Sequence, residues 1–455
     1  MTANFSDRLG LNSTNGESLP TRDETRVTEE LRRLKAHLHQ QLVMGMNLAA
    51  LGSMNKEQLR QEVRRVADEL CQRSNNLLSR QERERLVNEV LDDTFGLGPL
   101  EPLMQDPSIT DILINGHQTV YLERNGRLEK APISFTDEKH LITTIQRIVS
   151  RTGRRIDETS PMVDSRLPDG SRINAIIPPL ALDGALVSIR RFGVKPILAT
   201  DLIQKNALTA EMMQFLAACV RSRLNILISG GTGSGKTTLL NALSAFIPDD
   251  ERVVTIEDAA ELRLQQPHVG RLESRPANGE GAGEFTIRDL VRNALRMRPD
   301  RIIVGECRGS EALDMLQAMN TGHDGSLTTV HANDTRDALA RLEIMVGMAG
   351  LDLPLWVIRR QITSAIHIVV QVTRLIGGVR KIVKISEVTG VEGENFAMHD
   401  IFIFKQTGVD DQRRAQGYFQ ATGIRPQCLS RLHSFGAGLC PEIFERRMMD
   451  GARPS

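Results

Sequence analysis

The sequence predicts an α/β protein in which a larger domain with a parallel sheet follows a smaller α+β domain and a short helical bundle. Three observations support this prediction. Short apolar runs alternate with helical segments from residue 206 onward, which is typical of parallel sheets. Strand-like runs joined by tight turns dominate residues 111–192. Apolar residues at helical spacing recur between Val27 and Leu91.

The N-terminal part of the chain divides into a tail and a helical region. Residues 1–25 are rich in Ser, Thr, Asn and Asp, and because they contain few apolar residues, we expect a disordered tail. Three stretches with apolar residues every three or four positions predict three amphipathic helices within residues 26–95. Docking to a partner and capping of an assembly fit these helices equally well. Gly96, Gly98 and Pro99 end the region.

Residues 96–192 are predicted to form the smaller α+β domain. Its strand-like runs include two pairs centred on an Asn-Gly and an Asp-Gly dipeptide, which favour tight hairpin turns. One amphipathic helix is expected at Asp137–Arg151. Residues 193–205 show little periodicity and contain a proline, which indicates a linker. Residues 206–455 then form the larger domain.

Charge and composition argue against a nucleic-acid partner. Lys plus Arg and Asp plus Glu both number 57, so the formal net charge is zero and no field of the whole molecule attracts nucleic acid or anionic lipid. Aromatic residues make up only 4% of the chain, which leaves few side chains on which bases could stack. We therefore expect no direct nucleic-acid binding.

Cysteine usage and hydropathy predict a reduced, cytoplasmic protein without a transmembrane segment. The N-terminus has no apolar signal-peptide core, and no run of about 18 apolar residues occurs. The cysteines are odd in number, far apart and without C-x-x-C spacing, so neither a disulfide framework nor a metal site is indicated. They are Cys71, Cys219, Cys307, Cys428 and Cys440.

The chain contains one complete phosphate-binding motif. An apolar run at residues 225–229 leads into a glycine-rich loop, and a helical segment follows at residues 239–243. The G-x-x-x-x-G-K-T pattern requires this order of strand, loop and helix, because main-chain amides then surround phosphate oxygens at a helix N-terminus. A plain glycine-rich turn is the structural alternative, and we reject it. We expect ATP to bind Gly230, Gly231, Thr232, Gly233, Ser234, Gly235, Lys236, Thr237 and Thr238.

Two further apolar runs end in carboxylates, as strands of an open α/β sheet do at their ligand-binding edge. Glu306 ends one run and is predicted to contact Mg²⁺ together with the hydroxyl of Thr237. Glu257 ends the other run and is predicted to position the attacking water, ahead of Glu261 one turn later. Asp258 fits equally well as a helix N-cap. A buried strand end and a solvated acidic surface are the structural alternatives.

Three segments of the chain resemble, in order and spacing, motifs of the type II/IV secretion ATPases. They are TIEDAAEL at residues 255–262 (Asp box), RIIVGE at residues 301–306 (Walker B) and GHDGSLTTVHAN at residues 322–333 (His box). Three more segments resemble, in their residue pattern, the corresponding segments of the CpaF-type ATPases that drive assembly of Tad/Flp pili. These lie at residues 96–116, 167–184 and 422–432. The resemblance covers about residues 80–445, and Cys307 stands where valine or leucine is commoner.

The resemblance implies an architecture and a set of residue roles. It implies a cytoplasmic homo-hexamer, peripheral at the inner membrane, that hydrolyses ATP to drive pilus or secretion platform proteins. Each subunit is expected to have a PAS-like N-terminal domain hinged to a RecA-like P-loop ATPase domain, with ATP between them. Glu257 resembles the general base and Glu306 the Walker B carboxylate. His331 resembles the residue that senses the γ-phosphate, with His323 as a lesser candidate.

Arginines are the expected source of further positive charge at the nucleotide, because ring ATPases often take such groups from a neighbouring domain or subunit. The smaller domain offers Arg166, Arg172, Arg190 and Arg191. Arg190 and Arg191 lie beside the predicted linker, so one of them is expected to reach the nucleotide when the domains close. A solvated surface pair is an equal alternative. A helix is expected to make subunit contacts through Arg288, Arg292, Arg296 and Arg298.

Several other functions fit part of the pattern. A conjugation-type export ATPase has the same motif set, and a nucleic-acid-dependent RecA-like motor has the same expected fold. A P-loop kinase or GTPase fits less well, since no guanine-specific Asn-Lys-x-Asp segment follows the loop. A non-enzymatic protein that uses ATP only to hold an assembly together requires no carboxylate for hydrolysis.

Overall fold

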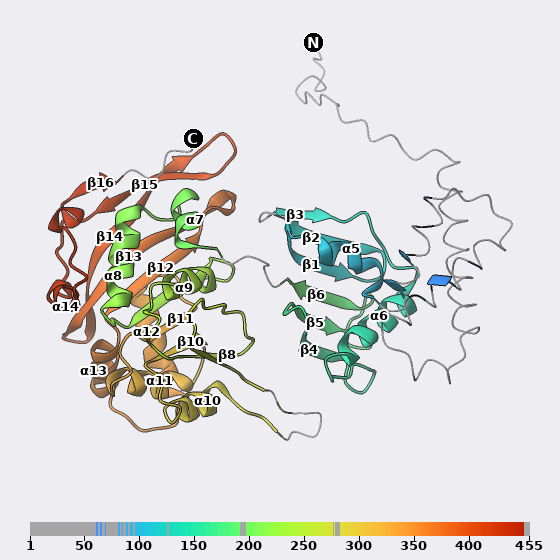
Figure 1. Cartoon of the computed structure of the whole chain (residues 1–455), viewed down its shortest axis with the longest axis horizontal. Helices are drawn as coiled ribbons and strands as arrows, with labels where there is room; N and C mark the ends of the chain where they lie inside the picture. Colours follow the sequence, from blue (N-terminus) through green and yellow to red (C-terminus); the bar gives the residue numbers. More distant parts are fainter. Residues whose placement is uncertain are drawn as a thin grey trace, which may run out of the picture.

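The computed structural model describes residues 96–449, apart from 125–126, 192–196, 276 and 278–282, together with isolated positions between residues 61 and 93. Several predicted segments therefore lie outside the described residues: the tail at 1–25, almost all of the helical region at 26–95, the Asn125-Gly126 turn and linker residues 193–196. The described part forms two domains of unequal size that face each other (Figure 1). None of its helices is both long and apolar enough to cross a bilayer.

The smaller domain is a six-stranded antiparallel sheet with one long helix. The sheet has the order β3-β2-β1-β6-β5-β4. Its strands are β1 (Ile109–Asn115), β2 (Thr119–Arg124), β3 (Arg127–Lys130), β4 (Met162–Arg166), β5 (Arg172–Ile176) and β6 (Leu186–Arg190). The helical elements are η1 (Gly98–Leu100), α5 (Glu101–Gln105) and α6 (Glu138–Ser150).

Helix α6 matches the helix expected at Asp137–Arg151. The Asp137 side chain caps it by accepting a hydrogen bond from the amide of His140 at 2.7 Å. Leu141, Ile145 and Ile148 on its inner face join alternate residues of the strands in one hydrophobic core. Because side chains alternate along a strand, the opposite face of this sheet carries polar and partly exposed residues.

The larger domain alternates strands and helices and then continues as antiparallel strands. Its helical elements are α7 (Ala199–Gln204), α8 (Ala210–Arg221), α9 (Lys236–Ser244), α10 (Ile287–Ala294), α11 (Glu311–Asn320), α12 (Thr335–Gly347), α13 (Leu355–Ala365), η2 (Ile376–Gly378), α14 (Leu429–Ser434) and η3 (Pro441–Phe444). Its strands are β7 (Ile226–Gly230), β8 (Val253–Glu257), β9 (Val269–Glu273), β10 (Arg301–Cys307), β11 (Leu327–Val330), β12 (Ile368–Arg374), β13 (Arg380–Glu392), β14 (Asn395–Val409), β15 (Ala415–Ala421) and β16 (Arg447–Met449).

These strands form one sheet of order β16-β15-β14-β13-β12-β7-β11-β10-β8-β9. The six strands from β12 to β9 in this order run parallel, and β12 to β16 pair antiparallel. Strand β7 lies inside the parallel part, between β11 and β12, and all five of its residues are buried. The chain therefore leaves the sheet at the carboxyl end of an interior strand, close to the middle of the row of strands.

Two hydrophobic cores cover the two faces of this sheet. One core joins α8, α9 and the C-terminal elements, with Phe215, Phe402 and Phe444 at its centre. The other core joins α10, α11, α12 and α13. The strands are nearly continuous apolar runs because both faces are buried.

Two expectations about helices differ from the structure. The predicted linker at 193–205 contains helix α7, whose first turn is closed by Asp201 accepting from the amide of Leu198 at 2.8 Å. The arginine-rich helix ends at Ala294, so Arg296 and Arg298 are not part of it. Arg298 has a positive φ of 54°, and Pro299 follows it, which prevents the helix from continuing.

Candidate functional site

The candidate site lies where the parallel strands of the larger domain end. Strand β7 ends at Gly230 and β8 ends at Glu257. Glu306 is the penultimate residue of β10, and His331 directly follows β11. These strands are neighbours in the sheet, so their carboxyl ends gather four predicted site residues at one edge.

The segment from Gly230 to Gly235 joins β7 to α9, and its shape requires glycine at Gly230 and Gly235. A Cβ atom on Gly230 would lie 2.3 Å from the carbonyl oxygen of Val372 and 2.6 Å from Oγ of Ser234. Gly235 precedes α9 with a φ of 103°, which L-residues rarely adopt. The helix begins at Lys236, so its free amides point into the loop as an anion site requires.

Lys236 is buried and points back over the loop. Its Nζ atom donates to the carbonyl oxygens of Gly230 and Gly231, each at 3.1 Å. The same atom lies 3.3 Å from Nε2 of His331. Burial lowers the pKa of Lys236, Glu306 raises it and Arg308 lowers it. The ammonium group therefore lies between the glycine-rich loop and the carboxylate edge.

Glu257 is a buried carboxylate with a strongly shifted pKa. Its side chain is 3% exposed, and Oε2 accepts the amides of Glu261 at 2.7 Å and Leu262 at 2.8 Å. Burial raises the pKa to about 7, although these two amide hydrogen bonds oppose the shift. Its Oε1 atom is buried and has no hydrogen-bond partner among the described residues. A carboxylate with this pKa can accept a proton at neutral pH.

The carboxylate of Glu306 contacts the imidazole of His331 and the guanidinium group of Arg308. Nε2 of His331 lies 2.7 Å from Oε1, and Arg308 donates to Oε2 at 2.6 Å. Arg308 also lies 3.4 Å from Asp258, which accepts a hydrogen bond from Ser274 at 2.7 Å. Burial and the nearby cations Lys236 and Arg308 lower the pKa of His331, and Glu306 raises it. This network fixes the orientation of the Glu306 side chain.

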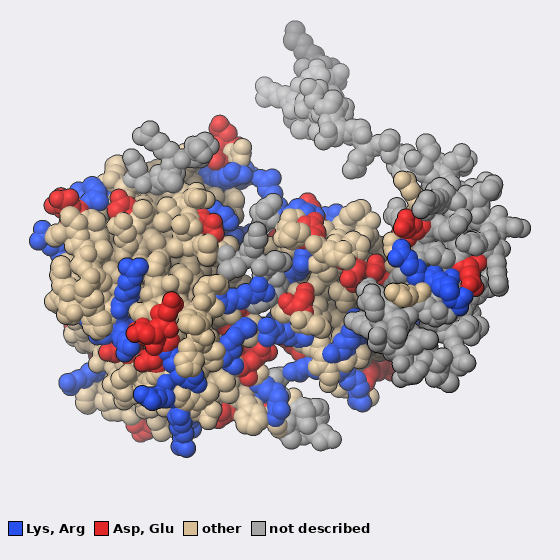
Figure 2. Space-filling model, in the orientation of Figure 1, with Lys and Arg blue, Asp and Glu red and all other residues tan. Residues whose placement is uncertain are grey.

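These residues line a cleft of about 760 Å³ between the two domains. Most predicted site residues line the cleft; Gly230, Gly231, Arg166 and the lesser candidate His323 do not, and the carbonyl groups of Gly230 and Gly231 bind Lys236. Thr237 and Thr238 are half-buried in the first turn of α9 and lie in the cleft wall. Glu261 also lines the cleft, and its main-chain amide supports Glu257. Figure 2 shows acidic and basic side chains together where the domains meet.

Arg190 and Arg191 both line the cleft but make different contacts. Arg190 is mostly exposed, and its Nε atom lies 3.4 Å from Asp111. The guanidinium group of Arg191 donates to the carbonyl oxygens of Leu103 and Asp106 within its own domain. Arg190 is therefore the more exposed of the two, whereas main-chain groups of the smaller domain hold Arg191.

Arg172 is a third arginine of the smaller domain that lines the cleft. It projects from β5 into the cleft and pairs with Asp164, with Nε 2.9 Å from Oδ1. The hydrogen bond that Arg172 donates to Asp164 contributes most to raising the pKa of Arg172, and the charges of Asp258 and Glu261 contribute as well. Sequence reasoning included Arg172 among four arginines but favoured Arg190 and Arg191 because of their position beside the linker. The sequence alone does not show which charged residues of the two domains face each other across the cleft.

The start of β13 supplies two cleft residues that no sequence motif indicated. Arg380 donates from Nε to the carbonyl oxygen of Gly233 at 2.9 Å, so it supports the phosphate loop from the side. Lys381 is buried, donates to the carbonyl oxygen of Asn206 and lies over the rings of Phe404 and Phe419. Burial lowers its pKa to about 8.

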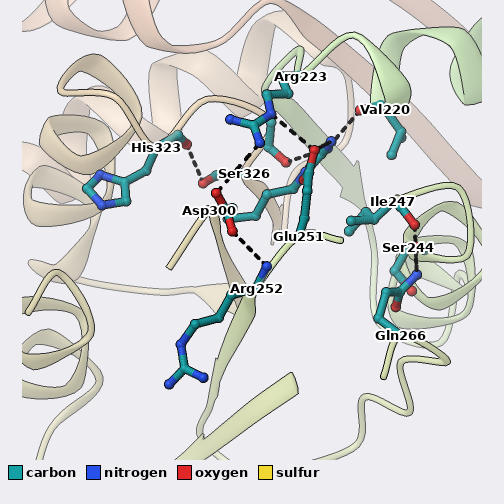
Figure 3. A network of polar contacts seen from close by, with 12 residues as sticks. Val220, Arg223, Ser244, Ile247, Glu251, Arg252, Gln266, Asp300, His323 and Ser326 are labelled. Atoms are coloured by element: carbon teal, nitrogen blue, oxygen red, sulfur yellow. Dashed lines mark hydrogen bonds and ion pairs between the residues drawn. The ribbon is translucent and has the colours of Figure 1, made fainter. Parts of the chain in front are cut away.

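His323 belongs to a different polar network at the opposite edge of the sheet (Figure 3). Its carbonyl oxygen accepts from Ser326, whose hydroxyl also accepts the amide of Ile302 near the start of β10. The centre of this network is Arg301, which is fully buried and pairs with Glu251. Of the two histidines in the predicted His box, only His331 lies in the cleft.

The donors present suit Mg²⁺ bound with a nucleotide. Mg²⁺ usually takes one or two protein oxygens together with phosphate oxygens and water, and Thr237 and Glu306 offer a hydroxyl and a carboxylate in one cleft. Within the described residues, no group of three or more His, Cys, Asp or Glu side chains could hold a metal ion. The hydroxyl of Thr237 and the carboxylate of Glu306 therefore suit a metal ion that also binds phosphate oxygens.

Comparison with known proteins identifies the family. Residues 93–425 match the model of the family described as "Type II/IV secretion system protein". The chain belongs to this family. Most of both described domains falls within the matched range, including the glycine-rich loop, the carboxylate edge and the cleft-facing arginines.

Two relatives are named for different transport systems. A Mycobacterium tuberculosis protein named for conjugal transfer is 39% identical over 304 residues, which cover 66% of this chain and 86% of the relative. The type IV secretion system protein VirB11 of Brucella suis is 33% identical over 316 residues, which cover 64% of this chain and 88% of the relative.

Two solved structures are similar to parts of the chain. The VirB11 ATPase of Brucella suis is 31% identical, with a TM-score of 0.35, and the match covers 66% of this chain and 96% of that one. The Legionella pneumophila ATPase DotB is 22% identical, with a TM-score of 0.45, and the match covers 61% and 76% of the two chains.

Proposed function

We propose that this chain is a motor ATPase that hydrolyses ATP in the cleft and converts the reaction into movement of its two domains. One observation carries the proposal. The glycine-rich loop with Lys236 faces a buried carboxylate, Glu257, whose pKa is raised to about 7. Arginines of the other domain line the same cleft. Hydrolysis requires this combination of phosphate binding, proton acceptance and positive charge.

Each predicted residue has a role in this proposal. The loop amides from Gly230 to Thr238 and the ammonium group of Lys236 bind the phosphates. Glu257 orients the attacking water and accepts its proton, with Glu261 positioning Glu257 through its amide. Thr237 and Glu306 would hold Mg²⁺, which would neutralise phosphate charge when bound. His331 contacts both Glu306 and Lys236, so it can respond to the γ-phosphate.

We further propose an architecture for the whole chain. The larger domain, residues 206–455, is a RecA-like P-loop ATPase domain, and residues 96–192 form a PAS-like domain joined to it through residues 193–205. The N-terminal tail at 1–25 and the helical region at 26–95 precede them. Six copies form a homo-hexamer, in which Arg190, Arg191 or Arg172 reaches the nucleotide of its own or a neighbouring subunit.

In the cell, we propose that the hexamer works at the cytoplasmic face of the inner membrane. Its partners would be platform proteins of a Tad/Flp pilus, as the CpaF-like segments of the sequence suggest. Family membership supports a secretion machine in general. The Tad assignment is tested by deleting the gene in its host and imaging surface pili. Normal pili in the deletion strain would contradict it.

A conjugation-type export ATPase is the second candidate. Relatives named for conjugal transfer and for type IV secretion favour it. In that case the deletion strain would keep its pili and lose transfer of a secreted substrate. A nucleic-acid-dependent motor is the third candidate, and it predicts that DNA or RNA stimulates ATP hydrolysis by the purified protein.

The proposed reaction is tested by steady-state ATPase measurements on the full chain. Lys236→Ala should abolish both binding of a fluorescent ATP analogue and hydrolysis. Glu257→Gln should retain binding and lower hydrolysis at least about 100-fold, because the amide cannot accept the proton. Lys130→Ala, which removes an exposed lysine of β3, is the matched control and should behave as the unaltered chain. Unchanged hydrolysis by Lys236→Ala would overturn the proposal, and the nucleotide preference separates an ATPase from a GTPase.

A further inference from the structure

Strand β12 contains one polar residue within a buried apolar run. Ile368, Val369, Val370 and Val372 are buried hydrophobic residues, and Gln371 among them is only 2% exposed. Amide side chains are seldom buried this deeply, since burial costs free energy unless their polar atoms form hydrogen bonds. The position of Gln371 inside the sheet therefore calls for a specific explanation.

One half of the Gln371 amide has a partner and the other half has none. Nε2 donates to the main-chain carbonyl oxygen of Ala332 at 3.3 Å. Oε1 is buried and accepts no hydrogen bond from any described residue. A buried oxygen without a partner destabilises the folded state, and an apolar side chain of similar length would avoid this penalty. Stability alone thus favours an apolar residue at this position.

The hydrogen bond of Gln371 crosses a neighbouring strand. Strand β7 lies between β12 and β11, and its residue Ser229 is the register partner of both Gln371 and Val330. Register partners lie on the same face of a sheet. Ser229 is fully buried, and its small side chain leaves room for the longer glutamine to extend over β7. Gln371 thereby connects β12 to the segment that directly follows β11.

That segment carries His331, which contacts two predicted site residues. His331 directly precedes Ala332. Its Nε2 atom lies 3.3 Å from Nζ of Lys236 and 2.7 Å from Oε1 of Glu306. The imidazole can keep both contacts only if the main chain at this point stays in place.

Two side-chain hydrogen bonds hold the main chain around His331. Thr329, two residues earlier, donates from its hydroxyl to the carbonyl oxygen of Gly305 at 2.8 Å. Gln371 holds the carbonyl group of the residue after His331. The first bond ties the end of β11 to β10, and the second ties it to β12 on the other side. Loss of the second bond releases the segment on one side only.

We propose that Gln371 is a positioning residue for His331. Its amide fixes the main chain directly after the histidine and so keeps the imidazole against Lys236 and Glu306. The response of His331 to the γ-phosphate belongs to the proposed function, and the contribution of Gln371 to catalysis rests on it. The unsatisfied Oε1 atom is then explained by function and not by stability.

Two substitutions separate function from stability. Gln371→Met removes the donor at nearly the same length, so it should unfold at the same urea concentration as the unaltered chain or a higher one. Gln371→Asn is one methylene too short to reach Ala332 and leaves a buried amide unpaired, so it should unfold at a lower concentration. The matched control is Gln361→Met on α13, because Oε1 of Gln361 is also buried without a described partner and the residue lies outside the cleft.

Hydrogen exchange measures the position of the segment without any nucleotide. Amides of residues 331–333 should exchange about fivefold faster in Gln371→Met and Gln371→Asn, the factor that corresponds to loss of one hydrogen bond of about 1 kcal/mol. Gln361→Met should exchange like the unaltered chain. Unchanged exchange in Gln371→Met would overturn the proposal.

Nucleotide binding shows whether Gln371 acts through His331. Both Gln371 variants should lower the preference for a non-hydrolysable ATP analogue over ADP by about fivefold, with little change in ADP affinity. Added to His331→Ala, which should itself lower this preference, Gln371→Met should have no further effect. An equal loss with and without the histidine would overturn the proposal. A Gln371→Met chain that loses stability in step with its binding preference would also overturn it, because Gln371 would then serve packing alone.

The two proposals can fail separately. If the unaltered chain neither binds nor hydrolyses ATP, the proposed function is wrong, and hydrogen exchange still decides whether Gln371 holds the segment around His331. If the unaltered chain hydrolyses ATP and Gln371→Met matches it in exchange and in nucleotide preference, the role of Gln371 alone is refuted.

Discussion

The Cγ atom of Glu257 lies 2.9 Å from the point that a Cβ atom would occupy on Gly305. Glu257 ends β8, and Gly305 is close to the end of the neighbouring strand β10. The carbonyl oxygen of Gly305 accepts a hydrogen bond from Thr329 at 2.8 Å, so the main chain cannot easily withdraw. The position of the Glu257 side chain thus depends on Gly305, which has no side chain, on the adjacent strand.

Gly305→Ala should therefore displace Glu257 without altering the phosphate loop. A shift of about 1 Å in a catalytic group lowers a rate about 100-fold, so kcat should fall by about that factor. Binding of a fluorescent ATP analogue should change little. Gly347→Ala, where an added Cβ meets nothing within 4 Å, is the control. A Gly305→Ala enzyme with unchanged kcat would show that the position of Glu257 is not critical.

ATP hydrolysis should depend on pH through Glu257. The ionised form is needed to accept a proton, and burial raises the pKa of Glu257 to about 7. Below that value the ionised fraction falls about tenfold per pH unit, so kcat at pH 6 should be roughly a tenth of its plateau above pH 8. The measurement is kcat at saturating ATP from pH 5.5 to 9, with Lys130→Ala, which removes an exposed lysine of β3, as a control. A flat profile between pH 6 and 8 would contradict the assigned role.

The same pKa shift predicts a pH-dependent stability. The pKa of Glu257 rises from an ordinary 4.5 to about 7 in the folded protein, so the folded state binds the proton more tightly than the unfolded state. Stability is then lost as pH rises from about 4.5 to about 7, by an amount on the order of 3 kcal/mol. Glu257→Gln removes this cost. It should unfold at higher urea concentration than the unaltered chain at pH 8, with no such advantage at pH 4.5.

Arg301 should be important for stability and not for chemistry. It is fully buried, donates to the carbonyl oxygens of Val220 at 2.7 Å and Gly325 at 3.3 Å, and pairs with Glu251. Arg301→Met leaves the buried Glu251 carboxylate with less compensation, so unfolding in urea should show a loss of about 3 to 5 kcal/mol. The exposed Arg336 gives a matched control, Arg336→Met. Because Arg301 lies at the edge opposite the cleft, protein that remains folded should still bind nucleotide.

The cleft arginines should separate into two groups. Arg172 faces Asp258 and Glu261 across the cleft, so Arg172→Ala should lower kcat about tenfold or more with little effect on unfolding. Arg191 donates to two main-chain carbonyl groups of its own domain, so Arg191→Ala should cost about 1 to 3 kcal/mol of stability. Thermal unfolding and kcat, measured on both variants, check this division. If Arg191→Ala lowers kcat and Arg172→Ala lowers stability instead, the result would favour Arg191 as the arginine that reaches the nucleotide.

The strand, glycine-rich loop and helix around Lys236 could be predicted from the sequence because they are contiguous. Strand, glycines, lysine and helix follow one another within about twenty residues, and local conformation alone brings them together. Strand ends were predictable for a related reason. Once β8 and β10 are parallel neighbours, Glu257 and Glu306 must lie at one edge of the sheet.

Other parts of the site depend on tertiary packing that no local pattern encodes. Arg380 supports Gly233 from 147 residues away, and Arg172 reaches the cleft only because the two domains face each other. The spacing of the arginines continues past Ala294 and predicts a longer helix than the structure contains. Pro299 is the local signal that the helix ends before it. The roles of the site residues, the pilus assignment and the domain boundaries remain predictions.

The walls of the cleft belong to different domains, and this has a consequence for inhibition. The phosphate loop comes from the larger domain, and Arg172 and Arg190 come from the smaller one. A small molecule that grips only the loop would compete with ATP yet leave the domains free to approach and separate. A compound with anionic groups at both ends would bridge loop and arginines and lock the two halves at one spacing. Such a compound would hold the protein in a single conformation.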